Sequence, residues 1–243
     1  MRSAASSVLT AAFVAALTAA GAVASPSHAI VFDFGSGSGQ QTATTPSDSN
    51  GVGNTRTFTV GTSSVTVSAW ALTGAGSTFE AAHLGLYSTG LGVCARTELP
   101  NCGNPAHQAD NDGPDEFMLF LFNGPVDPTI VRIDPYGTYD RDVSYWTGNV
   151  GVVSLAGLTT GGLGGLGFGS RTDNDGTASG NARDVPILSG VVTAMLFGPK
   201  LGESDDRFKL KSMTVTKAPE PAALAIFGAG LLGLFTTARR RRA

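Results

Sequence analysis

The chain has 243 residues, enough for one sizeable domain or two small ones once targeting segments are removed. Only 14% of the residues are charged, and 33 glycines suit many short strands joined by tight turns. Residues 30–218 contain 11 basic and 18 acidic side chains. This acidic balance argues against nucleic acid as a partner and permits cation binding.

The first 29 residues have the features of a secretory signal peptide. Arg2 supplies a positive start, and the apolar run Val8–Ala20 is too short for a comfortable membrane span. Small-x-small cleavage sites end at Ala24 and at Ala29. We prefer cleavage by signal peptidase after Ala29, because Ile30–Phe34 already has the pattern of a first strand.

The stretch from residue 30 to residue 218 alternates apolar and polar residues with frequent turn signals, which indicates strands. We expect eight to ten short strands in a single all-β domain, a β-sandwich or jelly roll, with no amphipathic helix. The clearest strand patterns are Thr57–Val60, Val65–Trp70, Phe117–Phe122, Thr129–Ile133, Val150–Leu155, Ile187–Phe197, Phe208–Lys211 and Met213–Thr216.

Two stretches read as loops. Gly35–Asn54 is rich in Gly, Ser, Thr and Gln, and we expect it to be mobile. Gly161–Gly169 is rich in glycine and nominally contains a dinucleotide-binding fingerprint. The fingerprint carries no weight here, because no βαβ unit surrounds it.

Cys94 and Cys102 are the only cysteines, eight positions apart. In an exported protein they would meet an oxidising compartment, so we expect a disulfide that closes this small loop. Two free thiols are the alternative.

Two acidic loops contain oxygen ligands of the kind that calcium prefers. The first loop includes Asp110, Asp112 and Asp115, and the second includes Asp173 and Asp175. Neither loop has EF-hand spacing, and Asp or Asn before Gly is also common in ordinary turns. Calcium is therefore one interpretation of these five aspartates, and plain turns are the other.

A third cluster combines Asp140 and Asp142 with Tyr145 and Trp146. Aromatic rings beside carboxylates can bind sugars, the rings stacking on apolar sugar faces while the acids accept hydroxyls. The alternative is a strand whose Tyr and Trp enter the core. Paired carboxylates also occur in glycosidases, but their separation cannot be read from a sequence.

Other signs of catalysis are weak. His83 and His107 are the only histidines after the signal peptide, and each fits a structural or exposed role. No nucleophile elbow, zinc-binding helical His pair or P-loop is present. We therefore do not expect an enzyme. Ice binding would need a flat, regular threonine array, and the sequence shows only scattered Thr-x-Thr pairs.

The last 25 residues have three parts in order. Pro219, Glu220 and Pro221 come first, the uncharged run Ala222–Ala238 follows, and a cluster of four arginines precedes the final alanine. The run has 17 residues and would span about 25 Å as a helix, just enough for a thin bilayer. The positive-inside rule keeps the arginines in the cytoplasm and so places the preceding stretch on the exported side. The cluster consists of Arg239, Arg240, Arg241 and Arg242.

This order of parts resembles the PEP-CTERM sorting signal, a short domain that is also labelled an ice-binding-protein C-terminal domain. The resemblance implies processing by the membrane protease exosortase in a Gram-negative bacterium that makes exopolysaccharide. A tail anchor that is never cut is the alternative.

Together these observations predict three parts: a signal peptide (1–29), an exported β-sandwich (30–218) and a sorting signal with a transmembrane helix (219–243). The resemblance implies a structural or adhesive protein of the cell surface or extracellular matrix, associated with exopolysaccharide. Carbohydrate binding, with or without calcium, and polysaccharide hydrolysis are the alternatives.

Overall fold

The computed structural model describes residues 28–45, 47–73, 77–99, 107–135 and 137–218, and this part of the chain is all-β. Its strands form one hydrogen-bonded network of fourteen antiparallel members. Two short 3-10 helices accompany them, η2 (Arg96–Glu98) and η3 (Thr160–Leu166). The first seven strands are β1 (Ala29–Asp33), β2 (Gln41–Thr44), β3 (Thr55–Val60), β4 (Ser63–Thr73), β5 (Thr78–Ala81), β6 (His83–Tyr87) and β7 (Gly90–Cys94). The other seven are β8 (Ala109–Asp110), β9 (Asp115–Pro135), β10 (Val143–Gly148), β11 (Thr172–Asn174), β12 (Arg183–Pro186), β13 (Val192–Pro199) and β14 (Arg207–Lys217).

The long strand β9 joins two sections of the network. Its first half pairs with β4 on one side and β13 on the other, so the first section runs β2-β3-β4-β9-β13-β10-β11. Its second half pairs with β12 and β14, and the far edge of β14 pairs with β8, β7 and β1. One strand therefore belongs to both sections, which meet near Gly124 and Pro125.

A large apolar core contains residues from both sections. Met118, Phe120 and Phe122 alternate along β9, and Val131 and Ile133 enter the same core from its second half. Alternate residues of a strand point to opposite faces, so each section contributes one face to this core. This arrangement is consistent with a β-sandwich, and it confirms the all-β prediction.

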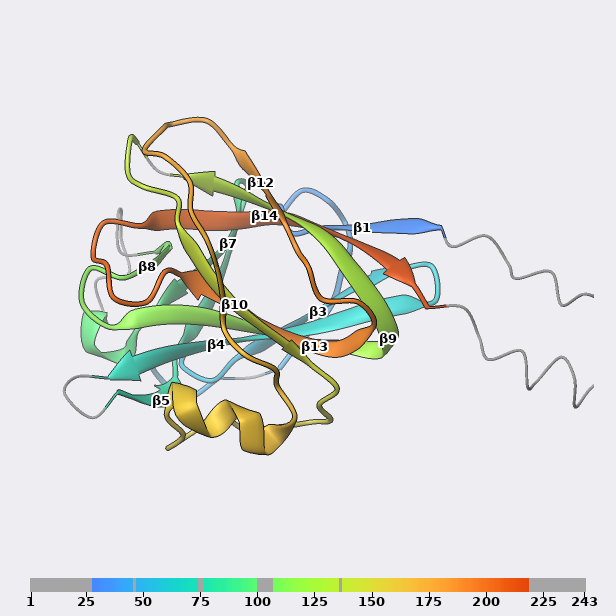
Figure 1. The fold of residues 1–243 in the computed structure, drawn as a ribbon, viewed down its shortest axis with the longest axis horizontal. Coiled ribbons are helices and arrows are strands. Elements are labelled where there is room, and N and C mark those ends of the chain that lie inside the picture. The colour runs from blue at the N-terminus through green and yellow to red at the C-terminus, as the bar shows by residue number, and fades with distance from the viewer. Residues whose placement is uncertain (1–27, 46, 74–76, 100–106, 136, 219–243) are drawn as a thin grey trace, which may run out of the picture. The chain divides into compact units, whose positions relative to one another are not determined.

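The other face of the first section is also covered, over part of its area. Phe117 and Leu119 of β9 lie in a second core, beside Trp146 of β10. Leu163 of the 3-10 helix η3 is 1% exposed in this core. Figure 1 draws η3 as the coiled ribbon at the lower edge of the body, near β5. The prediction of a loop over Gly161–Gly169 is therefore wrong for its first part, because an apolar side chain in every third or fourth position lets a short helix pack there.

Several strand boundaries differ from the predicted ones. β2 interrupts Gly35–Asn54, where only a loop was expected, and it pairs with β3. Val150–Leu155 contains no strand, because Val150, Val153 and Leu155 pack in the second core with η3 instead of joining the sheet. The predicted strand over Ile187–Phe197 begins only at Val192. The structure also has more strands than the eight to ten expected.

The two ends of the described body lie side by side. Ala29 at the start of β1 pairs with Thr216 near the end of β14. Figure 1 shows β1 beginning and β14 ending on the same side of the body. Residues 1–27 of the predicted signal peptide and the whole predicted sorting signal (219–243) lie outside the described residues, whereas Ala29, the last residue of the predicted signal peptide, belongs to β1.

Candidate functional site

Most of the buried polar side chains gather at one end of the body, where β8, β9 and β10 begin. We call this group the acidic network. Of the nine buried polar or charged residues in the described ranges, seven belong to it. The seven are Gln108, Asp110, Asn111, Glu116, Asp142, Ser144 and Asp206. Such a concentration matters because a buried polar group is destabilising unless it is hydrogen-bonded.

Glu116 is the most deeply buried acid of the network. Its two carboxyl oxygens accept the backbone N–H of Ala95 at 2.5 Å and of Asp110 at 3.3 Å. Burial, aided by the charges of Asp110 and Glu98, raises the pKa of Glu116 well above its ordinary value. Glu98 hydrogen-bonds the Glu116 side chain, and burial raises its pKa as well. Both carboxyl groups therefore hold a proton more readily than exposed glutamates do.

Asp206 links strands that are far apart in sequence. Its carboxyl oxygens accept the backbone N–H of Asp142 at 2.7 Å and the side-chain amide of Asn111 at 2.8 Å. Its own backbone N–H donates to the Asn111 side chain at 2.9 Å. Burial raises the pKa of Asp206 to about 7. Asn111 and Asp206 thus form a reciprocal clasp between the β8–β9 connection and the start of β14.

Three carboxylates lie close enough to hold a metal ion. Oxygens of Asp140, Asp142 and Asp206 all lie within 4.8 Å of one another. The ammonium group of Lys200 already neutralises this region, lying 3.4 Å from Asp142 and 2.8 Å from Asp175. The same ammonium lies 2.7 Å from Glu203. These hydrogen bonds raise the pKa of Lys200, so its ammonium group stays charged beside Asp142, Asp175 and Glu203.

The five aspartates predicted as calcium ligands do not converge on one point. Asp110 and Asp112 share a turn in which the Asp112 N–H donates to Asp110, while the Asp112 carboxylate pairs with Arg207. Burial raises the pKa of Asp115 to about 6. Asp173 accepts the Ser144 hydroxyl at 2.7 Å. Calcium binding stays a prediction. The carboxylates of Asp140, Asp142 and Asp206, which do lie close together, are not among these five aspartates. One of the five, Asp175, contacts Lys200.

The predicted sugar-binding cluster is wrong in its aromatic part. Tyr145 is 2% exposed in the core between the sections, and Trp146 is 4% exposed in the second core. Neighbouring residues on a strand point to opposite faces, so the two rings cannot form one platform. No face of either ring is open to a sugar. Asp142 belongs instead to the acidic network, and Asp140 lies beside it.

Hydroxyl groups from three strands form an uncharged surface on the first section. We call it the hydroxyl face, and its members are Thr42, Thr45, Thr55, Thr57, Thr59, Ser64, Thr66 and Ser68. Each member is exposed or half-buried. The register places Thr57 opposite Thr66, with their hydroxyl oxygens 3.0 Å apart. Thr42 and Thr59 are also 3.0 Å apart, and Thr45 and Thr55 are 2.9 Å apart.

Charge is absent from this face because of strand alternation. Arg56, the charged residue of β3, points to the opposite side, where its Nε donates to the Leu84 carbonyl at 3.2 Å. The sequence shows only scattered Thr-x-Thr pairs, and the sheet register aligns them into neighbouring rows. In the sequence, the alternation of threonine with apolar residues in β3 and β4 is the pattern that could have predicted this face.

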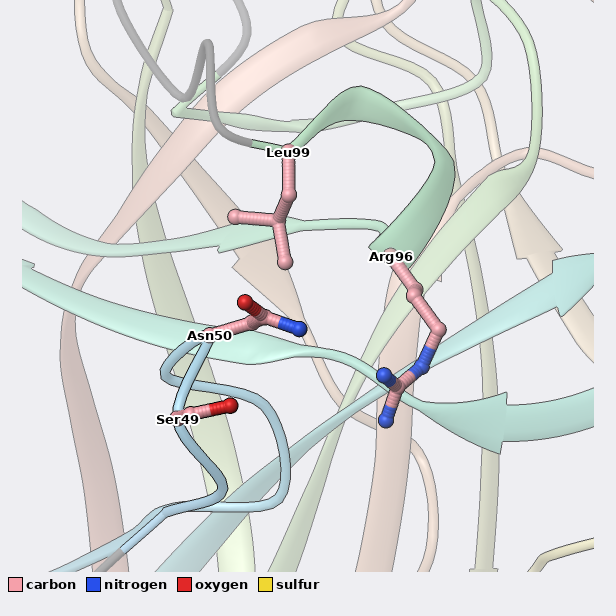
Figure 2. Close-up of a pocket in the computed structure, with 4 residues that line it drawn as sticks. All are labelled: Ser49, Asn50, Arg96 and Leu99. Atoms are coloured by element: carbon pink, nitrogen blue, oxygen red, sulfur yellow. The ribbon is translucent and has the colours of Figure 1, made fainter.

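A separate pocket of about 520 Å³ lies beside η2. Figure 2 shows its lining residues, Ser49, Asn50, Arg96 and Leu99. The Arg96 guanidinium pairs with Asp48 at 2.9 Å, so the charge that lines the pocket is already balanced. Nothing in this lining points to a particular reaction.

Several predicted features cannot be placed. The segment of Pro219, Glu220 and Pro221 and the arginine cluster lie outside the described residues, as does Cys102. Cys94 is 1% exposed at the end of β7, and no described cysteine is free. The Cys94–Cys102 disulfide stays a prediction. Within the described residues, no helix is long and apolar enough to cross a membrane.

Comparison with known proteins gives one result, and it concerns the end of the chain. A family model described as the PEP-CTERM protein-sorting motif matches residues 217–242. The match begins at Lys217, the last residue of β14. No curated protein and no solved structure matches the chain.

Proposed function

Because the chain carries a PEP-CTERM sorting motif, which implies exosortase-dependent export to the cell surface, we propose that its body is a structural or adhesive component of the extracellular matrix. The motif begins where β14 ends, so the whole described body is the cargo that this tag would sort. In this proposal the body is not an enzyme, and its partner is a neutral exopolysaccharide.

The hydroxyl face is the observation that supports this partner. Threonine and serine hydroxyls both donate and accept hydrogen bonds, as sugar hydroxyls do. The threonine methyl groups add apolar contacts suited to the C–H faces of sugar rings. An acidic body repels anionic polymers, while this uncharged face lets a neutral polysaccharide approach.

A double replacement of Thr57 and Thr66 by valine tests the proposal. Valine keeps the shape and strand propensity of threonine, and removing both partners of one hydroxyl pair leaves no unpaired group. We expect binding to neutral polysaccharides, measured by co-sedimentation or glycan array, to weaken about tenfold, because each lost hydrogen bond contributes roughly 0.5–1.5 kcal/mol.

The matched control replaces Thr214 and Thr216 of β14, which are also half-buried, by valine. This control should bind as the unmodified protein does. Equal loss in both double variants, or no binding of the unmodified protein to any neutral polysaccharide, contradicts the proposal.

Ice binding is a second candidate, because the same face brings threonines into neighbouring rows. A bulge between Gln41 and Ala43 breaks the regular spacing of β2 against β3. A flexible polysaccharide adapts to such a break better than a crystal lattice does, so we rank ice second. Uptake of the unmodified protein into growing ice, lost in the Thr57/Thr66 valine variant, would reverse this order.

A further inference from the structure

Large apolar side chains that face solvent are concentrated at one end of the body. Six such residues are exposed in the described part of the chain, and five of them lie near the end of β14. The five are Val31, Ile130, Val152, Leu188 and Val191. We call this group the apolar tip. The most exposed are Val152 at 98% and Leu188 at 82%. The sixth residue, Tyr139, lies at the opposite end, over the Arg207 guanidinium.

Strand pairing places the apolar tip around the exit of the chain. Leu188 and Val191 lie in the connection that leads into β13, whose first residue pairs with Val126. Val126 also pairs with Lys217, the last residue of β14. Val31 and Ile130 both pair with Thr214, on either side of β14.

Val152 belongs to the same end. It follows β10 by four positions, and its neighbour Val150 exchanges two hydrogen bonds of 2.8 Å with the Thr193 hydroxyl near the start of β13. The β9–β14 pairing brings two charged residues of opposite sign to this end, Asp127 opposite Thr216 and Lys217 opposite Val126.

The chain that follows is short. Only residues 218–221 separate β14 from the uncharged run that begins at Ala222. Four residues span at most about 14 Å when fully extended. If that run crosses the inner membrane before processing, the end of β14 cannot move farther than this from the bilayer surface.

We propose that the apolar tip lies against the lipid interface while the sorting tag still holds the protein in the membrane. This inference rests on the membrane-tethered route of the proposed function. Aliphatic side chains at an interface bind more strongly as more of their area leaves water. Unlike most exposed aliphatic residues, which are scattered, these five surround one tether.

The acidic network favours the same orientation. It lies near Arg207, at the other end of β14, and eleven residues of strand separate that end from Lys217 by roughly 33 Å. The large exposed aliphatic side chains of the described body all lie at the opposite end, so the acidic end offers little apolar area to a lipid interface. The body is therefore expected to stand with its apolar tip on the membrane and its acidic end toward solvent.

Tryptophan fluorescence of the full-length, unprocessed chain in phosphatidylcholine vesicles with brominated acyl chains tests this orientation. The variant L188W places a tryptophan in the apolar tip, and the control Y139W places one at the acidic end. The native Trp70 and Trp146 are buried and give the same background in both variants. We expect a blue shift and strong bromolipid quenching for L188W, and neither for Y139W.

Flotation of the vesicles distinguishes a missing membrane tether from a missing contact between the apolar tip and the lipid. A chain that does not float with the vesicles is not tethered, and the proposed route fails together with the inference. A chain that floats but is quenched equally at both positions, or at neither, retains the tether and overturns the membrane contact. A blue shift of L188W without bromolipid quenching shows that a second copy covers the tip, which also overturns it.

Discussion

Asp110 illustrates how burial sets the chemistry of single residues in the acidic network. Burial and the charge of Glu98 raise its pKa from 3.8 to about 7, although Arg207 opposes the shift. The folded protein therefore holds this proton more tightly than the unfolded chain between these two values. The protonated form contributes stability that is fully present below about pH 4 and is lost as the pH rises through 7.

Replacing Asp110 by asparagine should make stability less dependent on pH. The asparagine keeps an oxygen to accept the Asp112 N–H and cannot ionise. We expect its melting temperature to fall less than that of the unmodified protein between about pH 5 and pH 8, and its stability at the higher pH to increase by on the order of 1 kcal/mol. Asp206 and Glu116 retain raised pKa values, so part of the dependence should remain.

The matched control is Asp184→Asn, which changes an exposed aspartate paired with Arg132. Exposed ion pairs contribute little, so this variant should keep the pH dependence of the unmodified protein. Thermal unfolding followed by circular dichroism measures all three proteins. If the melting temperature of Asp110→Asn depends on pH as steeply as that of the unmodified protein, the raised pKa of Asp110 does not contribute to stability.

At the scale of elements, η3 shows how a glycine-rich segment can act as a structural layer. Its side chains are few, yet Leu163 closes a core that also contains Phe117 and Trp146. The helix ends at Gly167, whose φ of 101° suits glycine. Its backbone N–H donates to the carbonyls of Leu163 and Gly164 and so satisfies the last turn. Glycine therefore terminates this helix, and a phosphate-binding role is not needed to explain it.

Replacing Leu163 by alanine should destabilise the body by about 2–4 kcal/mol, because it removes a fully buried side chain and leaves a cavity. The melting temperature should fall by several degrees, and proteolysis between residues 150 and 168 should become faster. Leu188→Ala is the control, since 82% of this side chain is exposed. Equal melting temperatures for the two variants would show that η3 does not seal the core.

At the scale of the whole molecule, the two ends of the body are polarised. The acidic network surrounds the start of β14, and the apolar tip surrounds its end. The sorting motif begins at that second end.

Replacing Glu220 by alanine, or deleting residues 239–242, should leave the protein unprocessed or mislocalised in its native host. Both changes alter the matched motif and leave the body intact. Cell fractionation with mass determination of the mature C-terminus measures the outcome. Glu80→Ala, in β5 of the body, is the control and should be processed normally. Normal processing of the two motif variants would contradict the sorting role.

The sequence by itself determined what depends on neighbouring residues. Apolar runs and charge at the two ends indicate targeting, and period-two alternation in stretches such as Val65–Trp70 indicates strands, because both signals are local. The all-β class and the sorting motif follow from these patterns. The finer claims of a disulfide, calcium or a transmembrane helix stay predictions.

Only the tertiary structure decided which positions meet and which faces are covered. Asn111 and Asp206 are 95 residues apart and become partners through strand register. Tyr145 and Trp146 resemble a sugar platform until both of their faces prove to be buried. Whether an alternating strand points its second face to water depends on whether another segment, here η3, covers it, and a pattern within one strand carries no information about its neighbours.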